Sequence, residues 1–145
     1  MTSRLFEKYT LNNEKEVPGR LVIAPLILFS SNPDGSINEV EQNYLKCRDT
    51  DVGMYILGVA AISQDGLCFP GHPRAMSEKD LPSLEERAKI IKSQGALAIN
   101  QIHDAEMLAL TQYSRFDPFA PSAHVSNETL KEMGQFITEV KEFSD

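Results

Sequence analysis

The chain of 145 residues is 41% hydrophobic, which is enough apolar content to build the core of one ordinary domain. A formal charge of −7, with no basic stripe, argues against nucleic acid and anionic membranes as partners. No apolar run reaches transmembrane length, and the polar N-terminal segment is unlike a signal peptide, so we expect a cytoplasmic protein.

The first predicted elements follow a lead-in segment, residues 1–19, whose apolar side chains are scattered. Residues 20–25 form a short apolar run that ends at a proline, which predicts a first buried strand. After a turn-rich loop, Ser36 and Glu39 fit a capping box and predict a helix that ends near Arg48. Its expected buried stripe consists of Ile37, Val40, Tyr44 and Cys47.

The stretch of residues 52–66, VGMYILGVAAISQDG, predicts the central strand. Its apolar residues do not alternate with polar ones, which is typical of a strand buried on both faces in a parallel sheet covered by helices. A buried helix segment is the alternative. Two glycines and the β-branched Ile56 and Val59 favour the strand.

A long loop, residues 67–79, leads to a second helix with a capping box at Ser83 and Glu86. We expect this helix to end at Gly95, because glycine readily adopts the left-handed conformation found there. Its expected buried stripe consists of Leu81, Leu84, Ala88 and Ile91.

Residues 96–102, ALAINQI, predict a third strand, and a further long loop, residues 103–125, precedes a last helix over residues 127–143. Strands that alternate with amphipathic helices imply right-handed βαβ units and a parallel sheet. Both a doubly wound sheet and part of a (β/α)8 barrel fit this order. Both folds place their chemistry at the C-terminal ends of the strands.

Chemical motifs are few, since no glycine-rich phosphate motif, HExxH or CxxC occurs. Cys47 and Cys68 are expected to be reduced thiols, and His72 and His124 to lie at the surface. Gln101 either satisfies a buried backbone group or binds the edge of a planar heterocycle. Three polar residues after the third strand fit a solvated loop better than a metal or acid–base site: His103, Asp104 and Glu106.

The strand ends resemble those of the Old Yellow Enzyme family, FMN-dependent NAD(P)H:flavin oxidoreductases built on a (β/α)8 barrel. The similar stretches are RLVIAPL at residues 20–26, DVGMYILGVAAISQDG at 51–66 with FPG at 69–71, and GALAINQIH at 95–103. They cover nearly the whole chain but only the first part of a family member. The resemblance therefore implies an α/β fold: the first three β/α units of the barrel after the lead-in segment, as one partial domain over residues 1–145.

The resemblance also implies which residues contact the flavin. Pro25, Leu26 and Ile27 match a segment that packs against the flavin ring and hydrogen-bonds to it, and Val59 falls beside the flavin. Gln101 matches a glutamine that hydrogen-bonds the pyrimidine edge. The implied cofactors are FMN and NAD(P)H, and neither a catalytic residue nor a metal ligand is identified.

The sequence departs from the family pattern in places. Ile27 lacks the hydroxyl or thiol that tunes the flavin, Phe29 replaces a tyrosine found in a subset, and residues 104–107 replace His-Ala-Gly-Arg. The family's substrate-anchoring pair, proton-donating tyrosine, flavin arginine and phosphate site would all follow Asp145. We therefore expect weak or absent FMN binding by this chain alone.

Two functional hypotheses follow. In the first, the chain is the N-terminal part of an FMN-dependent oxidoreductase that passes hydride from NAD(P)H to a small-molecule substrate such as an activated alkene. In the second, it is a non-catalytic α/β fragment that acts only by associating with itself or with a complementary chain. A flavin absorbance spectrum of the purified chain would separate them.

Overall fold

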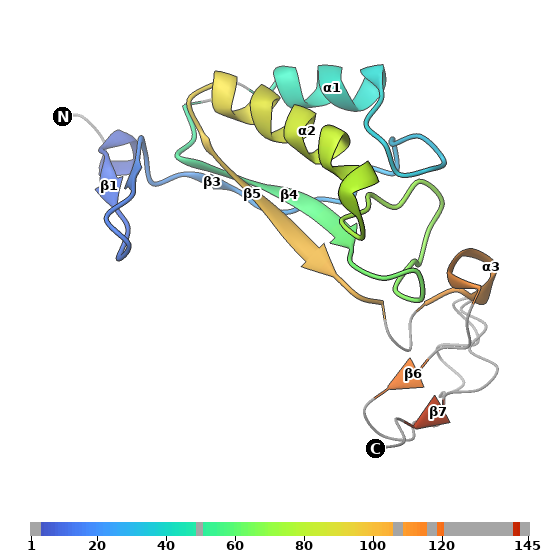
Figure 1. Cartoon of the computed structure of the whole chain (residues 1–145). Helices are drawn as coiled ribbons and strands as arrows, with labels where there is room; N and C mark the ends of the chain where they lie inside the picture. The colour runs from blue at the N-terminus through green and yellow to red at the C-terminus, as the bar shows by residue number, and fades with distance from the viewer. Residues whose placement is uncertain (1–3, 49–50, 106–108, 116–118, 121–140, 143–145) are drawn as a thin grey trace, which may run out of the picture.

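The structure, a computed structural model, describes residues 4–48, 51–105, 109–115, 119–120 and 141–142. A parallel sheet lies at its centre, in the order β3 (Val22–Ile23), β4 (Met54–Ala61), β5 (Leu97–His103). Two helices, α1 (Glu39–Lys46) and α2 (Leu81–Ser93), lie side by side over one face of this sheet (Figure 1). The expected order of strand, helix, strand, helix and strand is therefore confirmed from β3 to β5.

The other described elements are short. β1 (Tyr9–Thr10) and β2 (Glu16–Val17) pair as an antiparallel hairpin in the lead-in segment (Figure 1). Most of the last predicted helix, over residues 127–143, lies outside the described residues. The prediction is wrong for the end of this helix, because Lys141–Glu142 forms a strand, β7, that pairs with β6. The remaining elements are η1 (Arg4–Phe6), η2 (Glu78–Asp80), α3 (Thr111–Ser114) and β6 (Phe119–Ala120).

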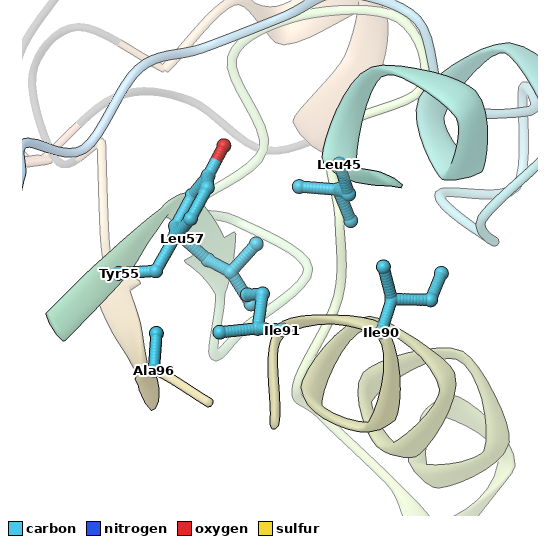
Figure 2. Packing of buried hydrophobic residues seen from close by; sticks show 6 residues of the cluster. All are labelled: Leu45, Tyr55, Leu57, Ile90, Ile91 and Ala96. Carbon is cyan, nitrogen blue, oxygen red and sulfur yellow. The ribbon is translucent and has the colours of Figure 1, made fainter. Parts of the chain in front are cut away.

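The core lies between the two helices and the sheet (Figure 2). Burial of an aliphatic or aromatic side chain of this kind contributes roughly 1.5–3 kcal/mol. The prediction that β4 is buried on both faces is wrong for the face opposite the helices, where Met54 and Ile56 are partly exposed. The buried members of the core cluster are Leu45, Tyr55, Leu57, Ile90, Ile91 and Ala96.

Helix α1 begins differently from the sequence prediction. Asn38 is its N-cap and accepts a hydrogen bond from the backbone N–H of Glu41 at 3.0 Å, so the capping box at Ser36 and Glu39 is wrong. Glu41 in the first turn faces the core and is 5% exposed. Two members of the expected stripe pack partly against the core, Ile37 and Tyr44, and two are exposed, Val40 and Cys47.

Helix α2 also begins earlier than expected. Ser77 and Asp80 form the capping box around η2, which runs directly into α2, so the box predicted at Ser83 and Glu86 is wrong. Gly95 follows the helix with φ of 88°, which confirms the left-handed end. In the expected stripe, Ile91 is buried and Leu81 is exposed. The other two members, Leu84 and Ala88, are partly buried.

Arg87 on α2 accounts for much of the difference between the expected and observed faces. Its guanidinium is 2% exposed and donates to the Glu41 carboxylate, from Nε to Oε1, at 2.7 Å. It also donates to Ser83 Oγ at 2.7 Å and to the carbonyl of Gly35 at 3.2 Å. The two helices are therefore joined by a buried polar network at positions where a helical pattern predicts apolar side chains.

Candidate functional site

The register of the sheet decides which side chains share a face near its C-terminal end. Leu57 pairs with Asn100 on the face that the helices cover. The register then shifts at Gly58, and Val59 pairs with Gln101. Because opposite residues of paired strands point to the same side, this β-bulge places Val59 on the uncovered face together with Gln101.

The segment after β3 runs beside the bulge. A Cβ atom at Gly58 would lie only 2.4 Å from the carbonyl oxygen of Leu26, so the close approach requires glycine. This contact sets Leu26 and Ile27 against β4 beside Gly58, on the edge of β4 opposite to β5. The five residues singled out from the sequence therefore lie at the same end of the sheet and are called here the strand-end cluster: Pro25, Leu26, Ile27, Val59 and Gln101.

The strand-end cluster is open to solvent. Leu26 is 59% exposed and Ile27 is 40% exposed, while Val59 is partly exposed. The amide of Gln101 is exposed and has no hydrogen-bond partner among the described residues. Exposed apolar groups beside a free amide, which carries both a donor and an acceptor, suit the edge and face of a planar heterocycle.

A row of four rings, which the sequence analysis missed, crosses the same end of the sheet. Phe29 packs edge-on against Phe69 at a centroid distance of 4.8 Å, and Phe69 stacks on His72 at 4.1 Å. His103 at the end of β5 lies 5.7 Å from His72. This aromatic row therefore links the ends of all three strands.

His72 is 1% exposed, so its predicted surface position is wrong. Its Nδ1 accepts a hydrogen bond from the backbone N–H of Cys68 at 3.4 Å, so the neutral ring carries its proton on Nε2. Burial, with added repulsion from His103 and Arg74, lowers the pKa of His72 from 6.5 to about 4. The ring is therefore neutral at neutral pH.

The cysteines are free thiols, as expected: Cys47 is exposed and Cys68 is partly buried. Cys68 Sγ lies 3.8 Å from His72 Nδ1 and 4.0 Å from His103 Nε2. Burial raises the pKa of the Cys68 thiol, which keeps it protonated and poorly nucleophilic.

The polar residues after β5 do not form a metal centre in the described part of the chain. Asp104 accepts a hydrogen bond from Ser63 Oγ at 2.8 Å, while Glu106 and His124 lie outside the described residues. Within the ranges that the structure describes, no group of three or more His, Cys, Asp or Glu residues could hold a metal ion. None of the described helices has the length and apolar character needed to cross a membrane.

Comparison with known proteins identifies relatives of this chain. The model of the NADH:flavin oxidoreductase / NADH oxidase family matches residues 4–144. The chain is 37% identical over 99 residues to a probable NADH-dependent flavin oxidoreductase, YqiG, of Bacillus subtilis, covering 68% of this chain and 27% of that protein. It is 32% identical over 126 residues to an NADH:fumarate oxidoreductase of Klebsiella pneumoniae, covering 85% of this chain and 14% of the relative.

Solved structures show the same fold. An Old Yellow Enzyme homologue from Zymomonas mobilis matches with a TM-score of 0.75 and 24% identity, over 84% of this chain and 34% of that one. Old Yellow Enzyme from Pichia sp. AKU4542 matches with a TM-score of 0.81 and 18% identity, over 99% of this chain and 38% of that one. The chain thus spans well under half the length of these relatives.

Proposed function

The chain belongs to the NADH:flavin oxidoreductase / NADH oxidase family, of the Old Yellow Enzyme type, and we propose that it supplies the first three strand ends of a flavin-binding barrel. In this proposal residues 1–145 form one partial (β/α)8 domain, in which β3, β4 and β5 are the first three barrel strands. The complete enzyme transfers hydride from NAD(P)H by way of FMN to an activated alkene or a similar small-molecule acceptor.

The observation that carries the proposal is the pairing of Val59 with Gln101 beside the segment after β3. It supports a flavin-facing role because these groups converge at the C-terminal edge of a parallel sheet, where cofactors bind in such folds. The unpaired Gln101 amide and the exposed Leu26 and Ile27 fit the polar edge and the apolar face of an isoalloxazine ring.

Each residue of the strand-end cluster has a binding role rather than a catalytic one. Gln101 orients the ring by pairing its amide with the pyrimidine edge, while Leu26, Ile27 and Val59 contact the ring and exclude water. Pro25 fixes the backbone as the chain leaves β3. When bound, FMN supplies the hydride chemistry, and these residues supply position and environment.

The test uses a chimera in which this chain replaces the matching part of the Bacillus subtilis relative. The chimera is expected to retain FMN, and Gln101→Leu in it to weaken FMN binding about tenfold, by loss of hydrogen bonds to the ring. Gln42→Leu, on α1 away from the strand ends, is the matched control and should leave the affinity unchanged. Fluorescence titration measures all three.

The melting temperature of the apo-chimera separates binding from stability. It should hardly change with Gln101→Leu, because the amide has no partner to lose within the described residues. A destabilised apo-protein with intact flavin affinity would reject the binding role. A folded chimera without flavin would reject the proposal itself.

A second candidate function is association without catalysis. The uncovered face carries Val22 and Ile99, which are 43% and 36% exposed, and β5 has a strand partner on only one edge among the described residues. Such a surface favours pairing with another chain, either a second copy or a complementary part of a barrel.

A further inference from the structure

A cavity of about 330 Å³ lies beside the aromatic row but outside the strand-end cluster. It is bordered by the loop after β4 and by α3, which are joined by a hydrogen bond from Gln64 Nε2 to the carbonyl of Tyr113 at 3.2 Å. Figure 1 shows α3 next to this loop. The polar residues that line the cavity are Gln64, His72, Arg74, Gln112, Tyr113 and Arg115.

The charge of this cavity is opposite to that of the chain. The formal net charge is −7, yet two guanidinium groups line the cavity, and no Asp or Glu is among the described residues that line it. Neither Arg74 nor Arg115 forms an ion pair with another described residue. Arg74 acts weakly on Asp34, whose carboxylate already accepts two hydrogen bonds from Ser36.

The cavity is also lined by residues with unpaired buried donors. Nε of Arg74 and Nε2 of His72 are buried and have no hydrogen-bond partner in the described part of the chain. Both are donors, because Nδ1 of His72 accepts the N–H of Cys68 and leaves the proton on Nε2. Unpaired buried donors are costly, and negative charge brought close to them by a ligand would offset part of that cost.

We propose that this cavity, the Arg74–Arg115 cavity, binds the oxyanion of a small molecule, a carboxylate or a phosphate, between Arg74 and Arg115. Guanidinium groups suit this role because their planar forks donate two parallel hydrogen bonds to carboxylate or phosphate oxygens. The neutral amides of Gln64 and Gln112 complete a polar wall that carries no negative charge. The proposal is independent of flavin binding, since it uses none of the strand-end cluster.

The test is a titration of the full chain with inorganic phosphate and, separately, with succinate, followed by NMR. Saturable shifts of the side-chain N–H signals of Arg74, Arg115 and His72 are expected. Tighter binding of phosphate indicates a phosphate-bearing ligand, and tighter binding of succinate indicates a carboxylate. If neither anion shifts these signals up to millimolar concentrations, the proposal is overturned.

Variants locate the binding independently. Arg74→Gln and Arg115→Gln should each weaken anion binding about tenfold, through loss of a charged hydrogen bond. Gln112→Glu adds a carboxylate to the wall without removing a described hydrogen bond and should abolish binding. Arg20→Gln, next to Tyr9 in the lead-in segment, is the control and should have no effect. Equal losses in all four variants, or in none, would overturn the site, and the wild-type NMR shifts decide it if a variant does not fold.

Discussion

Glu41 and Arg87 are joined by two parallel hydrogen bonds, from Nε to Oε1 at 2.7 Å and from Nη2 to Oε2 at 3.0 Å, with both side chains withdrawn from water. Ser31 extends the network by donating its hydroxyl to Oε2 of Glu41 at 2.9 Å. The pair therefore ties α1, α2 and the loop before α1 into one unit behind the strand ends.

Arg87→Met should destabilise the chain by roughly 3–5 kcal/mol, because it leaves the Glu41 carboxylate buried without its partner. Removing both charges with Glu41→Leu and Arg87→Met should recover a large part of that loss. Lys8→Met breaks the exposed pair with Glu16 and is the control, expected to cost about 1 kcal/mol at most. Urea unfolding measures these changes, and a loss below about 1 kcal/mol for Arg87→Met alone would contradict the prediction.

Gly58→Ala should also destabilise the chain, since the new Cβ would lie 2.4 Å from the carbonyl oxygen of Leu26. We expect a loss of about 1–3 kcal/mol, typical of overpacking, together with displacement of the segment after β3. Gly95→Ala is the comparison: it meets no atom within 4 Å, so only its φ of 88° adds a cost of about 1–2 kcal/mol. In the chimera, Gly58→Ala should lower flavin affinity and Gly95→Ala should not.

Stability should fall as the pH is lowered from about 6.5 toward 4. The pKa of His72 is 6.5 when exposed and about 4 in the fold, so the unfolded chain binds the proton first. Stability is unaffected by this group above the unfolded pKa, and the loss reaches about 3 kcal/mol near pH 4. His72→Gln should flatten this part of the pH profile, and an unchanged slope in that variant would exclude His72 as the cause.

The isolated chain should bind FMN weakly or not at all. Phosphate groups are held by backbone N–H groups at helix N-termini or by nests of amides, which barrel folds supply from their last strands. The strand-end cluster offers contacts to the ring only. Isothermal titration that gave submicromolar FMN affinity for the chain alone would contradict this expectation.

The chain should self-associate through its uncovered sheet face. Light scattering coupled to size exclusion is expected to give a mass above 16.2 kDa, because Val22 and Ile99 expose apolar surface there. Ile99→Lys should shift the mass toward the monomer, whereas Val40→Lys, on exposed α1 surface, should not. A well-folded monomer at high concentration would rule out this association.

Long apolar runs and glycine made part of the fold predictable. The two longer strands of the sheet and the helix end at Gly95 follow from apolar patterning and backbone freedom, which act locally. The resemblance of the strand ends to a known family located the five residues of the strand-end cluster, and the structure places them at the same end of the sheet. Their role as flavin contacts stays a prediction.

The errors share a physical origin. Patterning assigns charged residues to solvent, so it could not detect that Glu41 and Arg87 are buried as partners 46 positions apart in sequence. Patterning likewise predicted His72 at the surface. The ring of Phe69 stacks on His72, but both residues lie in a loop, where no periodic pattern indicates burial. The Arg74–Arg115 cavity lies between the loop after β4 and α3, and no local spacing in the sequence predicts it.

The bulge at Gly58 divides β4 into two parts, in which the side chains alternate between the two faces of the sheet in opposite order. Odd-numbered residues face the helices before the bulge, and even-numbered residues face them after it. Loss of the Gly58 codon would therefore leave Val59 on the uncovered face and Ala60 toward the helices, because the shortened strand would alternate regularly from Leu57 onward. Loss of any other codon between Met54 and Ala61 would act like a frameshift, because it would turn the residues on one side of the deletion to the opposite face of the sheet.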